Sequence, residues 1–411
     1  MIAFLKSNPR FFRFWLAGWA SEIGDWVRNI TMMFLVLDLS NGSAMSLSIN
    51  LFCEFAPIFL FGLFVGALAD RWNRQRTIMG AILFRAIIMV FLILAYLAGS
   101  LLLIYVCGFV SAIGTLFFRS ANQSFLMLFV EGVEERKTAT AMRQTATSSV
   151  QLLGPTAGAS FYLMMGAGGS LAITIFMFLV AVFLVSTIRV EQPEMSTKRT
   201  FAGIWKDVQD GFRYSWSNPY VRPILFTNMI YGFAAGIINV LEVFIITDFL
   251  GLPKEWMALL ATVQGAGMLV GSLFVNKLKL SLHRMMPVGL IVVGVFLAGM
   301  VAFRSFYATA ASLVLFSFGM IMVTFGMQAM KQIKVEFAYQ GRAGMSMSSA
   351  FNGFMVVTML ASGWLAKLYT IRPVIVLAGL AATLSGLILY TVFQRNLRQE
   401  QMRVSANSEV A

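Results

Sequence analysis

The sequence carries little charge for its length. Asp, Glu, Lys and Arg make up 12% of the 411 residues, whereas 59% are hydrophobic and the mean hydropathy is +0.79. Average soluble proteins are about 25% charged. So few charges cannot cover the surface of a water-soluble protein of this size. We therefore expect a protein that lies mostly in a lipid bilayer.

Cysteine and histidine are also scarce. Cys53 and Cys107 each fall inside an apolar run, which excludes a disulfide framework and argues against a metal cluster. His283, the only histidine, lies in a basic loop and offers no basis for a zinc site or a Ser-His-Asp triad. A Gly-x-x-x-x-Gly-Lys-[Ser/Thr] phosphate loop is missing, which argues against the use of ATP. We predict no enzyme activity, no cofactor and no metal.

The net charge of +13 would suggest a nucleic-acid partner in a soluble protein. Here the Lys and Arg residues recur in short groups between apolar runs, which is the pattern that membrane topology produces. We therefore expect no nucleic-acid partner.

Twelve stretches approach the roughly 20 apolar residues that a membrane-spanning helix needs. The first has no small-residue cleavage site and is predicted to be a spanning helix rather than a signal peptide. The predicted spans are 12–39, 47–69, 77–98, 101–129, 139–165, 169–188, 223–249, 255–275, 285–303, 308–335, 343–367 and 373–393.

The connections between these spans alternate in charge. One side has short loops at 40–43, 98–100 and 166–169, and its basic residues are Lys254, Arg304, Lys367 and Arg372. Most of the 31 Lys and Arg residues lie on the other side, in the N-terminus, in 70–76, 131–143, 189–222, 276–284 and 331–342, and in the tail. The positive-inside rule then predicts a multi-pass protein of the cytoplasmic membrane with both termini in the cytoplasm.

The longest polar connection, 189–222, separates six predicted spans from six. Within it, apolar residues of 201–214 recur at helical spacing, which favours an amphipathic helix on the inner membrane surface over a loosely structured linker. We predict an N-terminal half at 1–188, this linker, a C-terminal half at 223–393 and a cytoplasmic tail at 394–411. Six plus six spans would suit two parallel repeats.

The segment Gly66-Ala67-Leu68-Ala69-Asp70-Arg71-Trp72-Asn73-Arg74-Gln75-Arg76 follows the second span. Asp70 falls at the electronegative C-terminal end of that helix, where a carboxylate is disfavoured and needs a partner. Gly66, one turn earlier, would let a neighbouring helix approach. With Arg71 and Arg74 these residues predict a charged clasp that holds one conformation. A plain positive-inside loop would explain the arginines but not Asp70 or Gly66.

This segment resembles the signature loop of the major facilitator superfamily, Gly-x-Leu-Ala-Asp-Arg-x-Gly-Arg-Lys. Asn73 replaces the usual glycine, and since asparagine tolerates left-handed backbone we expect the turn to survive. The resemblance implies twelve transmembrane helices in two six-helix bundles, an all-α integral membrane fold. It also implies transport by rocking of the halves, and a monomer.

Two further patterns narrow the resemblance. Gly154, Pro155 and Gly158 in span five resemble the antiporter motif Gly-Pro-x-x-Gly-Gly, where proline predicts a kink and which implies export. The N-terminal Phe11-Phe12-Arg13-Phe14-Trp15-Leu16, with Ser21-Glu22-Ile23-Gly24-Asp25, is similar to the branch of macrolide efflux proteins and the enterobactin exporter. The family's Arg-x-x-Gln-Gly motif is not reproduced around Arg119, which weakens a proton role there.

Ionisable residues at membrane depth are functional candidates because burying charge in lipid is costly. Glu22, Asp25 and Arg28 share one face of span one, and a carboxyl there could bind and release a proton. The resemblance puts this span at the central cavity. The alternative is an Asp25–Arg28 ion pair that only locks helix packing. The other candidates are Glu242, Glu54 and Arg119; Arg85 and Arg119 are expected to reach the interface, and Arg85 to have a structural role.

We therefore expect a secondary active transporter that exports lipophilic or amphipathic small molecules in exchange for protons. The 38 Phe and 27 Met residues suit varied lipophilic ligands. A lysolipid or lipid flippase and a siderophore or dedicated metabolite exporter are alternatives within transport. Outside transport, a membrane enzyme would need a cluster of Asp, His or Cys near one interface. A non-transporting scaffold would leave the acidic residues within the spans unexplained.

Overall fold

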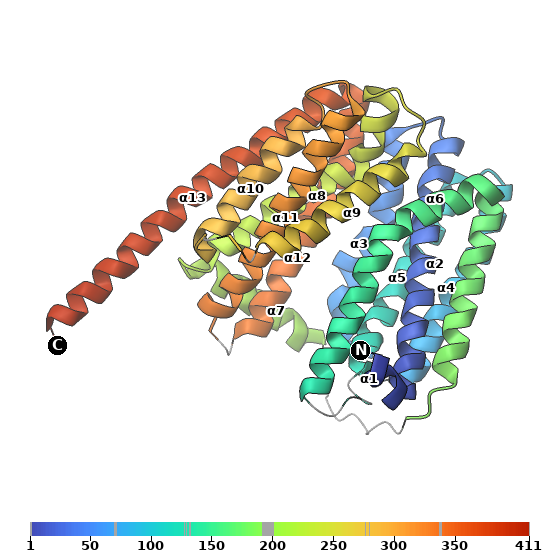
Figure 1. The fold of residues 1–411 in the computed structure, drawn as a ribbon, viewed down its shortest axis with the longest axis horizontal. Helices are drawn as coiled ribbons and strands as arrows, with labels where there is room; N and C mark the ends of the chain where they lie inside the picture. Colours follow the sequence, from blue (N-terminus) through green and yellow to red (C-terminus); the bar gives the residue numbers. More distant parts are fainter. Residues whose placement is uncertain are drawn as a thin grey trace. The chain divides into compact units, whose positions relative to one another are not determined.

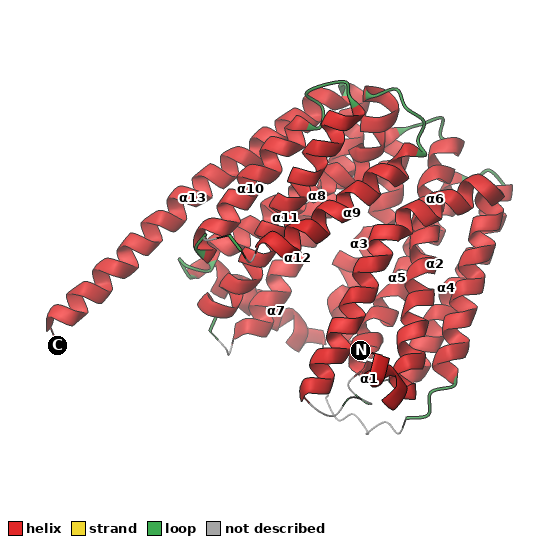
Figure 2. Ribbon diagram, viewed as in Figure 1, coloured by secondary structure: helices red, strands yellow, loops and turns green. Residues whose placement is uncertain are grey.

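Every regular element in the described part of the computed structural model is a helix (Figure 2). The structure describes residues 2–69, 72–126, 128, 130, 133–190, 201–275, 277–278, 280–336 and 339–410. Its helices are α1 (Ile2–Ser7), α2 (Pro9–Leu39), α3 (Ala44–Ala69), α4 (Arg74–Leu97), α5 (Leu101–Leu126), α6 (Val133–Ser186), α7 (Phe201–Ser217), α8 (Arg222–Phe244), the π-helical turn η1 (Ile245–Phe249), α9 (Trp256–Val275), α10 (Leu282–Gly299), α11 (Phe306–Lys334), α12 (Gln340–Leu368) and α13 (Ile371–Val410).

Nine helices of the described chain are long and apolar enough to cross a membrane. Helix α2 is not among them, and neither is α10, whose apolar stretch is shorter. The predicted spans 139–165 and 169–188 both fall on α6. Within the described residues, helix occupies most of each predicted span, while the number of helices that cross the bilayer stays a prediction.

Helix α6 is a helical hairpin rather than one rod. Its backbone leaves the helical region at Gly166, where φ is 68° and ψ is −175°. Glycine adopts this left-handed region without the steric penalty of a Cβ. The two limbs on either side of Gly166 run in opposite directions (Figure 1), so the chain reverses within the predicted 166–169 loop.

The chain divides into two compact units. The first contains Met1–Ile204 and also Lys254–Thr262, which include the first turns of α9. The second contains Trp205–Pro253 and Val263–Ala411. The linker helix α7 belongs to the second unit from Trp205 onward, and its first four residues belong to the first unit.

In the first unit, α2 packs along both limbs of α6, and α4 packs against α5 and α6. Gly24 of α2 lies directly against Phe178 on the second limb. The core joins apolar side chains of α2, α4, α5 and α6, including Ile82, Phe125 and Phe178. In the second unit, α8 packs along α12, and α10 packs between α11 and α13. Glycines bring these backbones together, such as Gly232 against the Phe351 carbonyl.

Helix α7 packs on the first turns of α12. Gly211 lies against the backbone of Arg342, and Arg342 Nε donates to Asp207 Oδ1 at 2.8 Å. The rings of Tyr214 and Tyr339 stack at 4.3 Å. The other face of α7 exposes three aromatic side chains at helical spacing, Trp205, Phe212 and Trp216. The predicted tail 394–411 continues the helix of α13 to Val410.

Candidate functional site

Glu22, Asp25 and Arg28 of α2 reach four different neighbouring helices. Glu22, Asp25 and Arg28 follow one another at one-turn spacing, as the sequence predicts. Glu22 accepts a hydrogen bond at Oε1 from the Thr147 hydroxyl of α6 at 2.8 Å. A small cavity beside Glu22 is also lined by Asn122 and Arg143.

Asp25 forms an ion pair with Arg85 of α4. The Arg85 side chain is fully buried and its guanidinium lies over the ring of Phe178 at 4.3 Å. Its Nε and Nη1 atoms have no hydrogen-bond partner within the described chain. The expectation that Arg85 extends to the membrane interface is therefore corrected: the side chain points into the bundle, because a carboxylate and an aromatic ring receive it there.

Arg28 connects α2 to α3 and α5. Its Nη2 atom donates to Glu54 Oε1 at 2.7 Å, and its Nη1 atom donates to the Ser111 hydroxyl at 3.0 Å. The same guanidinium donates to Asn29 Oδ1. The nearest Asp25 oxygen is 3.9 Å away. The main carboxylate partner of Arg28 is thus Glu54 rather than Asp25, and two carboxylates and two guanidiniums form one continuous, electrically balanced cluster.

Glu242 is a separate candidate in the second unit. Its side chain is buried in α8, and its Oε1 atom has no hydrogen-bond partner in the part of the chain that the structure describes. Asn239, one turn earlier, is exposed and donates to the carbonyl of Ala235. An uncompensated buried carboxylate costs several kcal/mol when charged, so Glu242 needs a proton or a partner.

The predicted clasp lies largely beyond what the structure describes. Asp70 and Arg71 fall outside the described residues, and Gly66 lies in the last turn of α3. Arg74 is the first residue of α4. Asn73 has φ −60° and ψ 113° and caps α4 by accepting from the Arg76 N–H at 3.0 Å. The left-handed turn expected at Asn73 is therefore corrected to an extended N-cap, a role that asparagine fills well.

The glycines of the predicted kink motif bring α6 onto α2. A Cβ at Gly154 would collide with the indole of Trp26, and one at Gly158 would press on Ile30. Pro155 lies inside the helix, while the described backbone of α6 becomes non-helical at Gly166. The role of Pro155 as a kink stays a prediction.

Two further observations complete the site. Arg119 is exposed on α5, and the described residues offer it no hydrogen bond or ion pair.

At the other end of α2, Asp38 pairs with Lys254 and accepts from the Tyr162 hydroxyl at 2.6 Å, all within the first unit. Sequence reasoning missed this group, and the only signal was the isolated acid at the end of span one. No group of three or more possible metal ligands occurs among the described residues.

Comparison with known proteins assigns the chain to a family. A family model described as a transmembrane secretion effector, of the MFS type, matches residues 4–410. The chain belongs to the major facilitator superfamily. The resemblance expected from the signature loop is thereby confirmed, and the protein is a multi-pass membrane transporter rather than an enzyme.

Relatives within the superfamily are distant. The MFS-type transporter YkuC of Bacillus subtilis (strain 168) is 25% identical over 308 residues, which cover 72% of this chain and 70% of YkuC. Macrolide efflux protein A of Streptococcus pyogenes is 23% identical over 270 residues, covering 65% and 66%. The structure of a variant of the nucleoside transporter NupG has a TM-score of 0.74 at 10% identity, covering 94% of this chain and 99% of that one. This last likeness concerns the fold alone.

Proposed function

We propose that this major facilitator protein exports lipophilic or amphipathic small molecules in exchange for protons. The observation that carries the proposal is the cluster of Asp25, Arg85, Arg28 and Glu54, in which two carboxylates balance two guanidiniums inside the first unit. Charged groups inside a membrane protein are expensive and mark ion and substrate pathways. In this proposal the protein acts as a monomer of the cytoplasmic membrane by alternating access.

In this proposal, Asp25 is the group of the cluster that takes up the proton. A proton on Asp25 would remove the charge that balances Arg85, and the guanidinium would keep its contact with Phe178. Asp25 suits this role because 23% of its side chain is exposed, whereas Arg85 is sealed. Protonation would therefore loosen the link between α2 and α4 without exposing Arg85.

The substrate class is inferred from a relative and from a sequence pattern. Two features favour export of a bulky lipophilic compound. One relative is named as a macrolide efflux protein, and the Gly-Pro-x-x-Gly pattern begins at Gly154. A lipid or lysolipid flippase and a siderophore or dedicated metabolite exporter use the same fold and remain the alternatives. A scaffold without transport would not explain why two carboxylates and two guanidiniums are buried together.

Efflux from loaded bacterial cells tests the proposal. Cells that express the intact protein or Asp25→Asn are loaded with a fluorescent lipophilic cation, and efflux is followed with and without a protonophore. A parallel assay uses a macrolide. We expect efflux by the intact protein that a protonophore abolishes, and little efflux by Asp25→Asn.

Two further variants make the result specific. Asp25→Asn with Arg85→Gln removes the proton site without leaving a buried unpaired charge. Loss of efflux there, with an unfolding midpoint near that of the intact protein, separates loss of coupling from a folding defect. Asp248→Asn changes an exposed carboxylate of η1 and should transport normally. Gradient-dependent efflux that survives Asp25→Asn would move the coupling site to Glu242 or Glu54. No efflux by the intact, inserted protein would favour a lipid or a single metabolite as the substrate.

The orientation is tested separately. With Cys53 and Cys107 replaced by serine, Ser100→Cys should react with a membrane-impermeant thiol reagent added to whole cells. Arg284→Cys should react only after the membrane is opened. The reverse pattern would contradict the proposal that both termini face the cytoplasm.

A further inference from the structure

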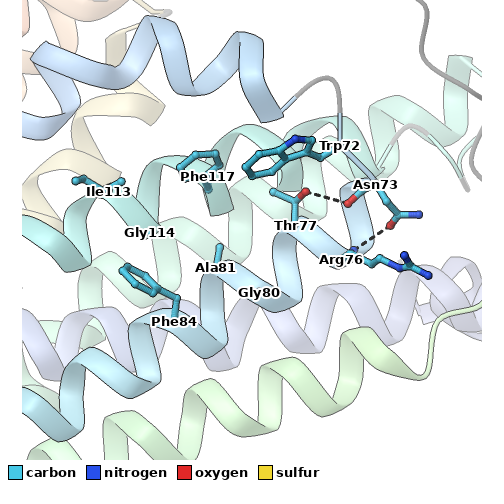
Figure 3. Close-up of a pocket in the computed structure, with 10 residues that line it drawn as sticks. All are labelled: Trp72, Asn73, Arg76, Thr77, Gly80, Ala81, Phe84, Ile113, Gly114 and Phe117. Atoms are coloured by element: carbon cyan, nitrogen blue, oxygen red, sulfur yellow. Dashed lines mark hydrogen bonds between the residues drawn. The ribbon is translucent and has the colours of Figure 1, made fainter.

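An open groove runs between α4 and α5 in the first unit. Its volume is about 710 Å³, within the roughly 300–1,000 Å³ typical of ligand sites. Figure 3 shows Trp72 and Arg76 at one end, and Gly80, Phe84 and Gly114 further along. The groove is therefore polar at one end and apolar along the rest.

The polar end coincides with the first turn of α4. Asn73 closes that turn by capping the Arg76 N–H, and the Thr77 hydroxyl donates to the Asn73 carbonyl at 2.9 Å (Figure 3). The Arg76 guanidinium is exposed and forms no ion pair within the described residues. Trp72 is half exposed and stacks on Phe117, with ring centroids 5.4 Å apart. A tryptophan beside an exposed arginine is typical of the membrane interface.

The apolar part owes its space to glycine. A Cβ at Gly80 would meet nothing within 4 Å, so the groove is open above this residue. Gly114 forms part of the lining, and a Cβ there would collide with the side chains of Phe84 and Arg85. Only Gly114 would thus separate a molecule bound in this part of the groove from the Arg85 side chain.

The surroundings of the groove are apolar and exposed. On α4, the large apolar side chains Leu83, Phe84 and Ile87 are each 40% exposed or more. From Arg76 to Phe84 the helix rises by about 12 Å at 1.5 Å per residue. Half of the hydrocarbon core of a bilayer is about 15 Å thick. The groove therefore matches one acyl chain that descends from the headgroup level.

We propose that the groove binds one anionic phospholipid, with its phosphate at Arg76 and an acyl chain along Gly80 towards Gly114. The charge of Arg76 and the electropositive start of α4 complement a phosphate. The tail fits the apolar lining that Gly80 leaves free. Lipid binding here requires neither the proposed transported substrate nor proton transfer at Asp25.

Native mass spectrometry of the purified full-length protein tests the proposal. The protein is titrated with a phosphatidylglycerol and with a phosphatidylcholine of the same acyl chains. We expect one tightly held phosphatidylglycerol. Gly80→Leu, which fills open space, should weaken binding of both lipids tenfold or more. Arg76→Gln should weaken phosphatidylglycerol alone, by about fivefold, the effect of one basic residue near an anionic headgroup.

Matched controls separate the groove from general changes. Gly168→Leu adds the same side chain in open space on α6, and Arg284→Gln removes an exposed arginine from the first turn of α10. Both should bind lipid as the unaltered protein does. Cross-linking of a photoactivatable phosphatidylglycerol to the unaltered protein gives a result that depends on no variant, with modified peptides expected in 72–84 and 113–117.

Three outcomes would overturn the proposal. Unchanged affinity of Gly80→Leu for phosphatidylglycerol would show that the lipid does not bind in the groove. The preference for phosphatidylglycerol could survive Arg76→Gln, which would remove the headgroup assignment. The cross-links could map to other helices, which would place the lipid elsewhere.

Discussion

Asp25 and Arg85 lie 60 residues apart in the sequence and form an ion pair between α2 and α4, with the arginine fully buried. The exposure of the two partners differs, since 23% of the Asp25 side chain remains accessible. A change in the charge of Asp25 therefore acts directly on a cation that has no access to solvent.

Asp25→Asn should destabilise the protein strongly, because it leaves the Arg85 cation buried without its counter-charge. Breaking a buried pair in this way costs about 3–5 kcal/mol. The midpoint of thermal unfolding in detergent should fall clearly. Asp25→Asn combined with Arg85→Met should recover most of the loss, because the buried charge is then gone. Equal midpoints for Asp25→Asn and the unaltered protein would show that the pair contributes no stability.

Glu242→Gln should behave in the opposite way. The Glu242 carboxyl is buried with an unpartnered oxygen, so a neutral amide of the same shape should leave the unfolding midpoint unchanged or raise it. The same thermal scan measures this, with Asp248→Asn as the exposed control. A lower midpoint for Glu242→Gln would mean that the carboxylate has a stabilising partner in the membrane.

Gly154→Ala should destabilise the first unit, because its methyl group would collide with Trp26. Overpacking of a tight contact costs about 1–3 kcal/mol. Gly168→Ala is the matched control, since a Cβ there meets nothing within 4 Å and should be neutral or slightly stabilising. If both variants unfold at the same temperature, the close approach of α6 to α2 is wrong.

At the contact between α7 and α12, the glycine should matter more than the salt bridge. The side chains of Arg342 and Asp207 are 43% and 29% exposed, so Asp207→Asn should cost only about 0–1 kcal/mol. Gly211→Ala would force α7 away from the backbone of Arg342 and should cost more. Limited trypsin digestion at Lys206 and Arg213 should accelerate in Gly211→Ala and change little in Asp207→Asn. The reverse order would make the ion pair the main attachment.

Hydropathy and charge were sufficient to predict where the helices lie. Long apolar runs specify helices in lipid, since backbone groups there must pair within their own segment. The reversal near Gly166 followed from a glycine-rich break between two apolar runs. Apolar residues at helical spacing predict a helix over 201–214, and α7 covers Phe201–Ser217.

The partners of the charged residues could not be predicted in the same way. Helical spacing brought Asp25 and Arg28 together, yet Arg28 pairs mainly with Glu54 and Asp25 pairs with Arg85. These partners come from other helices, and their approach depends on packing angles that no local pattern encodes. Asn73 was misjudged for a related reason, because asparagine suits both a left-handed turn and an N-cap.

The glycines that seat α6 on α2 also have a mechanical consequence. At Gly154 and Gly158 no layer of α6 side chains separates the two helices. Sliding one helix along the other would drive Trp26 and Ile30 into bulkier neighbours, and packed interiors resist such deformation. Helix α2 and the first limb of α6 therefore move as one rigid body. Any displacement of the charged face of α2 also displaces the whole first limb of α6.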